Sequence, residues 1–223
     1  MTKSITKPRP EMPIYFGLSI FLLVIGFLFG WQNPSRFRAQ LTPSLKQLVE
    51  SIQSTQGDTS WLHTFWVIFL NNATTTLEMA LFGIVVGIFP VFSMWLNGLL
   101  SGFVISLAQQ QDGIPAWQTI VYGILPHGIF ELTAIFWAAA LGIANGMATL
   151  RAVRLAYGRQ STIRGEQKRD DPLHFREQHP LRFSLLRTAR SLPIIWGILF
   201  IAALVEATVT PHIMAWGVPG IHH

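Results

Sequence analysis

The chain has 223 residues, of which half are hydrophobic and only 12% are charged, against about 25% in an ordinary soluble domain. This balance predicts an integral membrane protein with one helical bundle and no room for a separate catalytic domain of ordinary size. Because the chain has no cysteine, a disulfide framework and a thiolate metal site are both excluded. The net charge of +5 does not indicate nucleic acid, since the basic residues cluster beside apolar segments, where anionic lipid and membrane orientation explain them.

Basic residues are strongly segregated along the chain. No lysine or arginine lies between Lys46 and Arg151, whereas ten of the sixteen lie between Arg151 and Arg190. Because cytoplasmic loops collect lysine and arginine, residues 151–190 are predicted to form a cytoplasmic loop with a partly helical basic end. Three further basic residues before residue 10 predict a cytoplasmic N-terminus. Five spans across the cytoplasmic (inner) membrane would then place the C-terminus on the outer, non-cytoplasmic side.

The apolar segments predict an all-α, polytopic membrane helical bundle. Transmembrane spans are expected at about 14–31, 62–86, 91–108, 127–149 and 192–209. Gly87 and Pro90 are expected to break the chain between the second and third spans, and Pro126 to end a short re-entrant helix at 115–126. Residues 37–56 carry apolar side chains at helical spacing, which predicts an amphipathic helix on the membrane surface or a loop helix packed on the bundle.

Small residues recur four positions apart in the predicted spans, a spacing that lets helix backbones approach closely. This pattern does not distinguish contacts within one chain from contacts between copies. The positions are Gly26 and Gly30, Gly83 and Gly87, Gly98 and Gly102, and Ala138, Gly142 and Gly146.

Two ionisable residues, His127 and Glu131, lie inside an apolar segment long enough to cross a bilayer. A charged side chain at the bilayer centre is opposed by roughly 2.5 to 3.5 kcal/mol, so such groups persist mainly where they have a partner or a function. Their i, i+4 spacing places both side chains on one helix face, and Gly128 leaves space beside the histidine for another backbone or a ligand. This pair is the first candidate for a functional site.

Other polar residues in the apolar segments extend this candidate site. Because no lysine or arginine lies in the predicted spans, the carboxylates must be protonated, bonded to asparagine, paired with His127, or bound to a cation. These further residues are Asn71, Asn72, Glu78, Asn97, Asn145 and Glu206.

Three interpretations of the polar residues remain open. They can form interhelical hydrogen bonds that fix helix register, each worth on the order of 0.6 to 2 kcal/mol. They can bind zinc or a similar divalent metal, which requires His127 and Glu131 to converge with Glu206 or His212. They can also line an ion- or proton-coupled transport path, for which buried carboxylates beside broken helices are a general sign.

The arrangement of these motifs resembles the stage II sporulation protein M family of integral membrane proteins. The resemblance runs from about residue 61 to residue 211. It rests on the elements Asn71-Asn72, Asn97-Gly98, Pro126-His127-Gly128-x-x-Glu131-x-x-Ala134, and Ala202-Ala203-x-x-Glu206 with Thr210-Pro211.

The resemblance implies a function as well as a fold. It implies a polytopic helical bundle in the cytoplasmic membrane that acts as a non-enzymatic scaffold in a complex that remodels peptidoglycan, with hydrolysis performed by partner proteins. The expected partners are membrane lipids and other proteins of a membrane complex, or further copies of the chain. The family residues that carry over are Asn71, Asn72, Asn97, His127, Glu131 and Glu206.

Overall fold

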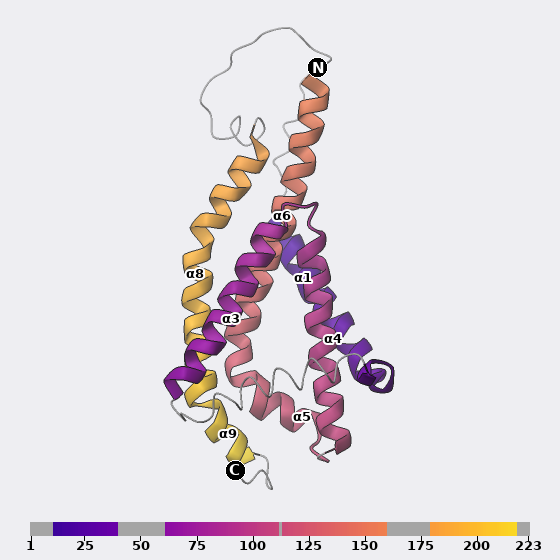
Figure 1. Ribbon diagram of the computed structural model, residues 1–223, viewed down its shortest axis with the longest axis vertical. Coiled ribbons are helices and arrows are strands. Elements are labelled where there is room, and N and C mark those ends of the chain that lie inside the picture. Colours follow the sequence, from indigo (N-terminus) through magenta and orange to yellow (C-terminus); the bar gives the residue numbers. More distant parts are fainter. Residues whose placement is uncertain (1–10, 40–60, 112, 160–178, 218–223) are drawn as a thin grey trace, which may run out of the picture.

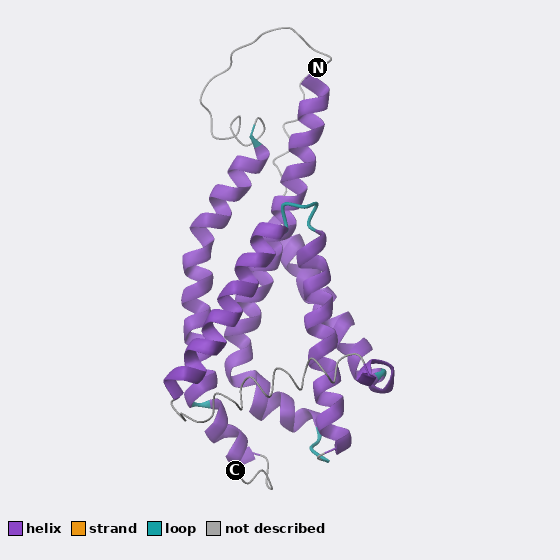
Figure 2. Cartoon of the chain, in the orientation of Figure 1, coloured by secondary structure: helices purple, strands orange, loops and turns teal. Residues whose placement is uncertain are grey.

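The computed structural model describes residues 11–39, 61–111, 113–159 and 179–217. Nearly all of these residues are helical, and the described part of the chain contains no strand (Figure 2). The predicted all-α membrane bundle is therefore confirmed.

Five long helices form the bundle. They are α1 (Glu11–Gln32), α3 (Trp61–Phe82), α4 (Ile88–Gln111), α6 (Leu125–Arg159) and α8 (Pro180–Thr208). Of these, α4, α6 and α8 follow the long axis of the bundle, while α1 and α3 are inclined to it (Figure 1). Three short elements gather at the end of the bundle where α3 begins and α4 ends (Figure 1). These are α5 (Ala116–Gln118), the π-helix η1 (Thr119–Ile124) and α9 (Thr210–Gly217).

Four helices are long and apolar enough to cross a membrane: Glu11–Gln32, Ile88–Gln110, Ala116–Tyr157 and Pro180–Thr208. Helix α3 also has 22 residues, but Asn71, Asn72, Glu78 and four threonines lower its hydropathy, and it is not among these four. The prediction of five spans includes α3 and stays a prediction.

The turn between α3 and α4 lies earlier than the sequence predicted. Helix α3 ends at Phe82, and α4 begins at Ile88, so Pro90 lies inside the first turn of α4, where proline is tolerated. The intervening turn uses left-handed backbone at Val86 and Gly87, with φ of 57° and 72°. The predicted bounds of 62–86 and 91–108 were therefore wrong at this turn.

The bend before α6 is made by a π-helix and lies before Pro126. The N–H of Leu125 donates to the carbonyl oxygen of Ile120, five residues back, which is the wide turn of a π-helix. Pro126 then occupies the first turn of α6. The segment predicted as a short helix at 115–126 is helical from residue 116, and it crosses the end of the bundle at an angle to α6 (Figure 1).

The segment 151–190, predicted to be a cytoplasmic loop with a partly helical basic end, is helical at both ends in the described residues. Helix α6 continues to Arg159, and α8 already begins at Pro180, because alanine, leucine and arginine in these stretches favour helix. Residues 160–178 lie outside the described residues, as does most of the amphipathic helix predicted at 37–56. After the last predicted span, which ends at about residue 209, the chain forms the additional helix α9.

The glycine pairs make their contacts within one chain. A Cβ atom added to Gly26 of α1 would lie 2.1 Å from the carbonyl oxygen of Trp95, and one added to Gly98 of α4 would lie 2.1 Å from that of Leu23. Each helix therefore places its glycines against the backbone of the other, which leaves no space for a side chain.

A second glycine contact holds the α3–α4 turn on α6. A Cβ atom on Gly83 would lie 2.4 Å from the Cα atom of Gly142, and one on Gly146 would lie 2.1 Å from the backbone nitrogen of Gly87. The turn backbone is thus covered by α6 at Gly83 and Gly87, while Val85 and Val86 of the same turn are exposed. Below this contact, α6 packs on α8 through Ala134, Ala138, Leu141, Ile195 and Leu199, all fully buried.

Candidate metal centre

Helix α6 presents His127 and Glu131 on the face that packs against α8. The two residues lie one turn apart, and the same face continues through Ala134 and Ala138, which are fully buried. The alanines allow α8 to approach closely, because they leave little side chain between the two backbones. The polar pair therefore lies directly beside α8.

Helix α8 contributes Glu206 from its last turn. Ala202 and Ala203, one turn earlier, are buried against the bundle and turn this face of α8 inward. The Nε2 atom of His127 lies 3.8 Å from Oε2 of Glu131 and 3.9 Å from Oε2 of Glu206. The three side chains are 12%, 22% and 31% exposed, so the cluster is shielded but still reachable by solvent.

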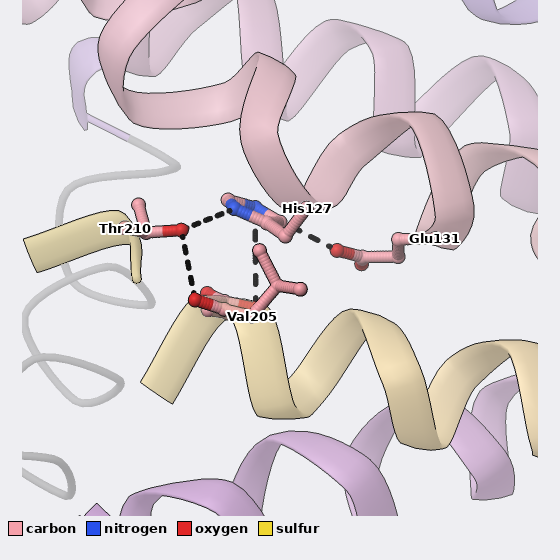
Figure 3. A network of polar contacts seen from close by, with 5 residues as sticks. His127, Glu131, Val205 and Thr210 are labelled. Atoms are coloured by element: carbon pink, nitrogen blue, oxygen red, sulfur yellow. Dashed lines mark hydrogen bonds and ion pairs between the residues drawn. The ribbon is translucent and has the colours of Figure 1, made fainter. Parts of the chain in front are cut away.

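The imidazole of His127 is held from its other side by the start of α9. Its Nδ1 atom lies 3.3 Å from Oγ1 of Thr210, and this hydroxyl donates to the carbonyl oxygen of Val205 at 3.3 Å (Figure 3). Because a hydroxyl has one proton, Thr210 then accepts the proton of Nδ1–H. In the neutral ring, this arrangement leaves the lone pair of Nε2 directed at the two carboxylates, and in the protonated ring Nε2–H forms the ion pairs with them.

Helix α3 completes the site through Asn72, whose side chain is hydrogen-bonded to the Glu131 carboxylate. An amide donor suits a carboxylate, since it satisfies one of the oxygens without adding charge. Residues from α3, α6, α8 and α9 therefore meet at one point.

Several predicted site residues lie elsewhere. Asn71 is exposed on α3, and the Asn97 amide donates to the Ser93 carbonyl oxygen of its own helix at 2.9 Å. A Cβ atom on Gly128 would lie 3.1 Å from the side chain of Ile124, so the neighbour of this glycine is η1. His212, the alternative ligand, has its Nδ1 atom 2.8 Å from the Thr208 carbonyl oxygen.

A separate polar network surrounds Asn145 in the middle of α6, 14 residues after Glu131. The Asn145 amide donates to the Ala80 carbonyl oxygen at 2.9 Å, and its oxygen accepts hydrogen bonds from Ser184 at 2.6 Å and Thr188 at 3.2 Å. All three polar side chains are buried. Since the amide of Asn145 is satisfied on both sides, this network fixes the register of α3, α6 and α8. Ser184 and Thr188 were missed because they lay in the predicted loop.

The ligand atoms of His127, Glu131 and Glu206 all lie within 4.8 Å of one another. Two ligand atoms bound to zinc at about 2.1 Å are about 3.4 Å apart in tetrahedral geometry. The distances from Nε2 to the two carboxylates exceed this by a few tenths of an ångström, which small side-chain rotations can close. One imidazole and two carboxylates also form a donor set that suits zinc and similar divalent metals.

Protein cations are distant from the two carboxylates. The nearest arginine before Glu206 on α8 is Arg190. It lies 16 residues away, which corresponds to about 24 Å along a helix. Glu131 precedes Arg151 by 20 residues, or about 30 Å. In the described part of the chain, the group that forms ion-pair contacts with these carboxylates is therefore His127.

The long apolar helices and the shared polar cluster define a polytopic helical membrane protein. Comparison with known proteins agrees, because the sequence pattern of the family described as stage II sporulation protein M matches residues 16–211. The chain belongs to this family. No curated protein and no solved structure matches it.

Proposed function

We propose that the chain is a non-enzymatic membrane scaffold in which a divalent metal ion, bound by His127, Glu131 and Glu206, joins α6 to the α8–α9 corner. The observation that carries the proposal is the convergence, within 4.8 Å, of one imidazole and one carboxylate from α6 with a second carboxylate from α8. A metal ion at this point would connect segments far apart in the sequence, which is a structural role.

A cation accounts for the arrangement better than hydrogen bonding among the three side chains alone. With Thr210 accepting from Nδ1–H, the neutral ring of His127 directs its Nε2 lone pair at two carboxylates. Three electron-rich groups repel one another unless a positive charge lies between them. A divalent ion accepts all three ligand atoms and neutralises both carboxylates, whereas one proton on Nε2 offsets only one of the two negative charges.

The surroundings of the cluster resemble the outer shell of known metal sites. A histidine that binds a metal through one ring nitrogen usually donates its other N–H to a nearby oxygen, which fixes the ring. Thr210 supplies that oxygen, and Asn72 supports the Glu131 carboxylate in the same way. Zinc is the first candidate, because imidazole and carboxylate both suit it.

The scaffold part of the proposal is supported by family membership. The stage II sporulation protein M family implies a component of a complex in the cytoplasmic membrane that remodels peptidoglycan, with partner proteins performing the hydrolysis. In this proposal the N-terminus lies in the cytoplasm and the partners are lipids and other membrane proteins or further copies of the chain.

Elemental analysis of the purified protein tests the metal site. Wild-type protein should contain close to one divalent metal ion per chain, and His127→Ala and Glu206→Gln should lose it. The matched control is Glu78→Gln, which removes an exposed carboxylate on α3 and should retain the metal. Wild-type protein that contains no metal, and takes up none when zinc is supplied, would contradict the metal site.

The scaffold role has its own test. Cross-linking in membranes followed by purification should recover a second membrane protein or a second copy of this chain. Recovery of the chain as an isolated monomer would contradict it. Reconstituted protein that carries a pH-dependent ion flux, lost in Glu131→Gln, would favour the transport interpretation instead.

A further inference from the structure

We infer that the metal centre opens at the non-cytoplasmic face of the membrane and exchanges its ion with that compartment. This inference rests on the proposed function and adds the side from which the ion is taken. It follows from the chemistry of the two ends of the bundle and from the position of the cluster relative to them.

Six of the eight arginines in the described residues lie at one end of the bundle, on α6 and α8, and the other two, Arg36 and Arg38, follow Trp31 at the opposite end. Arg151 of α6 binds Glu11 of α1 through two hydrogen bonds of 3.0 and 2.7 Å. The arginines of α8 lie in its first half, at positions 182, 187 and 190. Because arginine and lysine collect on the cytoplasmic side of membrane proteins, this end faces the cytoplasm.

The opposite end is defined by tryptophan. Trp31 at the end of α1 lies 3.5 Å from the Gln109 side chain at the end of α4, and α3 begins with the exposed Trp61. Trp117 and Trp216, on α5 and α9, are also exposed at this end (Figure 1). Tryptophan side chains concentrate at membrane–water boundaries, which places one boundary here.

The distance between the two ends matches the thickness of a bilayer. Glu11 and Trp31 are 20 residues apart on α1, which corresponds to about 30 Å of helix. The hydrocarbon core of a typical membrane is about 30 Å thick. The arginine end and the tryptophan end therefore lie close to the two surfaces of the membrane.

The cluster lies at the tryptophan end. Glu131 is also 20 residues from Arg151 along α6, and Glu206 is 19 residues from Arg187 along α8, or about 30 and 28 Å. Both carboxylates are therefore level with the boundary marked by Trp31. Their partial exposure of 22% and 31% is consistent with access from water at that face.

The short elements α5, η1 and α9 surround the cluster at this end of the bundle. Tyr122 of η1 lies against Gly217 and packs edge to face on Trp216 of α9, while Gly123 contacts the side chain of Met214. These elements cover the end of the bundle around the cluster (Figure 1). An ion that enters from this side reaches the ligands without crossing the apolar core formed by Ala138, Leu141 and Leu199.

The sidedness can be tested with a chelator that does not cross membranes. Metal-loaded protein in right-side-out vesicles should lose its metal to external EDTA, whereas protein in inside-out vesicles should keep it until a membrane-permeant chelator is added. The readout is metal content after purification from each preparation. Loss from inside-out vesicles only, equal loss from both, or loss to the permeant chelator only would each overturn the inference.

Failure of the sidedness inference can be distinguished from failure of the proposed function, because protein that contains no metal before chelation contradicts the metal site itself.

A cysteine-labelling experiment establishes the orientation independently, since the natural chain contains no cysteine. Trp216→Cys and Tyr157→Cys replace aromatic residues that are 82% and 76% exposed at opposite ends. An impermeant maleimide added to intact cells should label the first variant and not the second, and the reverse result would overturn the inference.

Discussion

Thr210 holds the imidazole of His127 from a different helix, with its Oγ1 atom 3.3 Å from Nδ1 across 83 positions of sequence. The contact exists because α8 ends at Thr208 and the chain turns at Val209 into α9. The turn directs the Thr210 hydroxyl toward α6 while the same hydroxyl donates to the Val205 carbonyl oxygen. The hydroxyl thereby fixes both the tautomer and the orientation of the ring.

Replacing Thr210 with valine should weaken metal binding while the fold is retained. Valine has the shape of threonine but lacks the hydroxyl, so Nδ1 loses its acceptor and the ring can rotate. Loss of such an outer-shell contact typically lowers metal affinity by about 10- to 100-fold. A competition titration with a zinc indicator would measure the change. The control is Thr208→Val, because the Thr208 hydroxyl donates only to the Leu204 carbonyl oxygen of its own helix. Equal zinc affinity in the two variants would contradict the role of Thr210.

Gly146→Ala should destabilise the bundle. Its Cβ atom would lie 2.1 Å from the backbone nitrogen of Gly87, so α6 and the α3–α4 turn would have to separate. Overpacking of this kind typically lowers the free energy of unfolding by about 1–3 kcal/mol. Thermal unfolding in detergent would measure the loss.

The matched control for this substitution is Gly197→Ala on α8. A Cβ atom on Gly197 meets no heavy atom within 4 Å, so the alanine should leave stability unchanged or raise it by roughly 0.5–1 kcal/mol through helix propensity. Equal unfolding temperatures for the two alanine variants would contradict the close contact at Gly146.

Asn145→Ala should also lower stability, by a different mechanism. The substitution leaves the buried Ser184 hydroxyl and the Ala80 carbonyl oxygen without their partner, and interhelical hydrogen bonds in membranes are worth roughly 0.6–1.7 kcal/mol. The comparison variant is Asn97→Ala, because the Asn97 amide donates to its own helix and joins no second helix. A smaller loss of thermal stability in Asn145→Ala than in Asn97→Ala would argue against the network.

Local sequence patterns predicted the fold class and drew attention to the residues that form the cluster. The i, i+4 spacing of His127 and Glu131 depends only on helix geometry. Glu206 was included because the predicted spans contain no basic residue that could pair with a carboxylate. These arguments need no knowledge of how the helices pack.

The contacts that depend on packing could not be predicted in the same way. Thr210 contacts His127 only because the chain turns at Val209, and a threonine followed by Pro211 is the one local sign that a new helix begins there. The glycine spacings likewise predicted close packing without identifying the partners of Gly83 or Gly146. The length of α6 was underestimated because arginine was taken as a mark of a loop, although arginine is a good helix former.

The ion pair between Glu11 and Arg151 should make a modest contribution to stability. The two side chains are 33% and 41% exposed, and pairs with this exposure are typically worth about 0.2–1 kcal/mol. The pair joins the start of α1 to α6, so we expect its loss to loosen α1 more than the rest of the bundle. A double-mutant cycle with Glu11→Gln and Arg151→Gln, read by unfolding in detergent, would give the coupling free energy between the two residues.

Exchanging the charges, in a double variant with Glu11→Arg and Arg151→Glu, should recover part of the stability lost in either single reversal. If the double exchange is as unstable as the sum of the single reversals, the two residues do not interact in the folded protein.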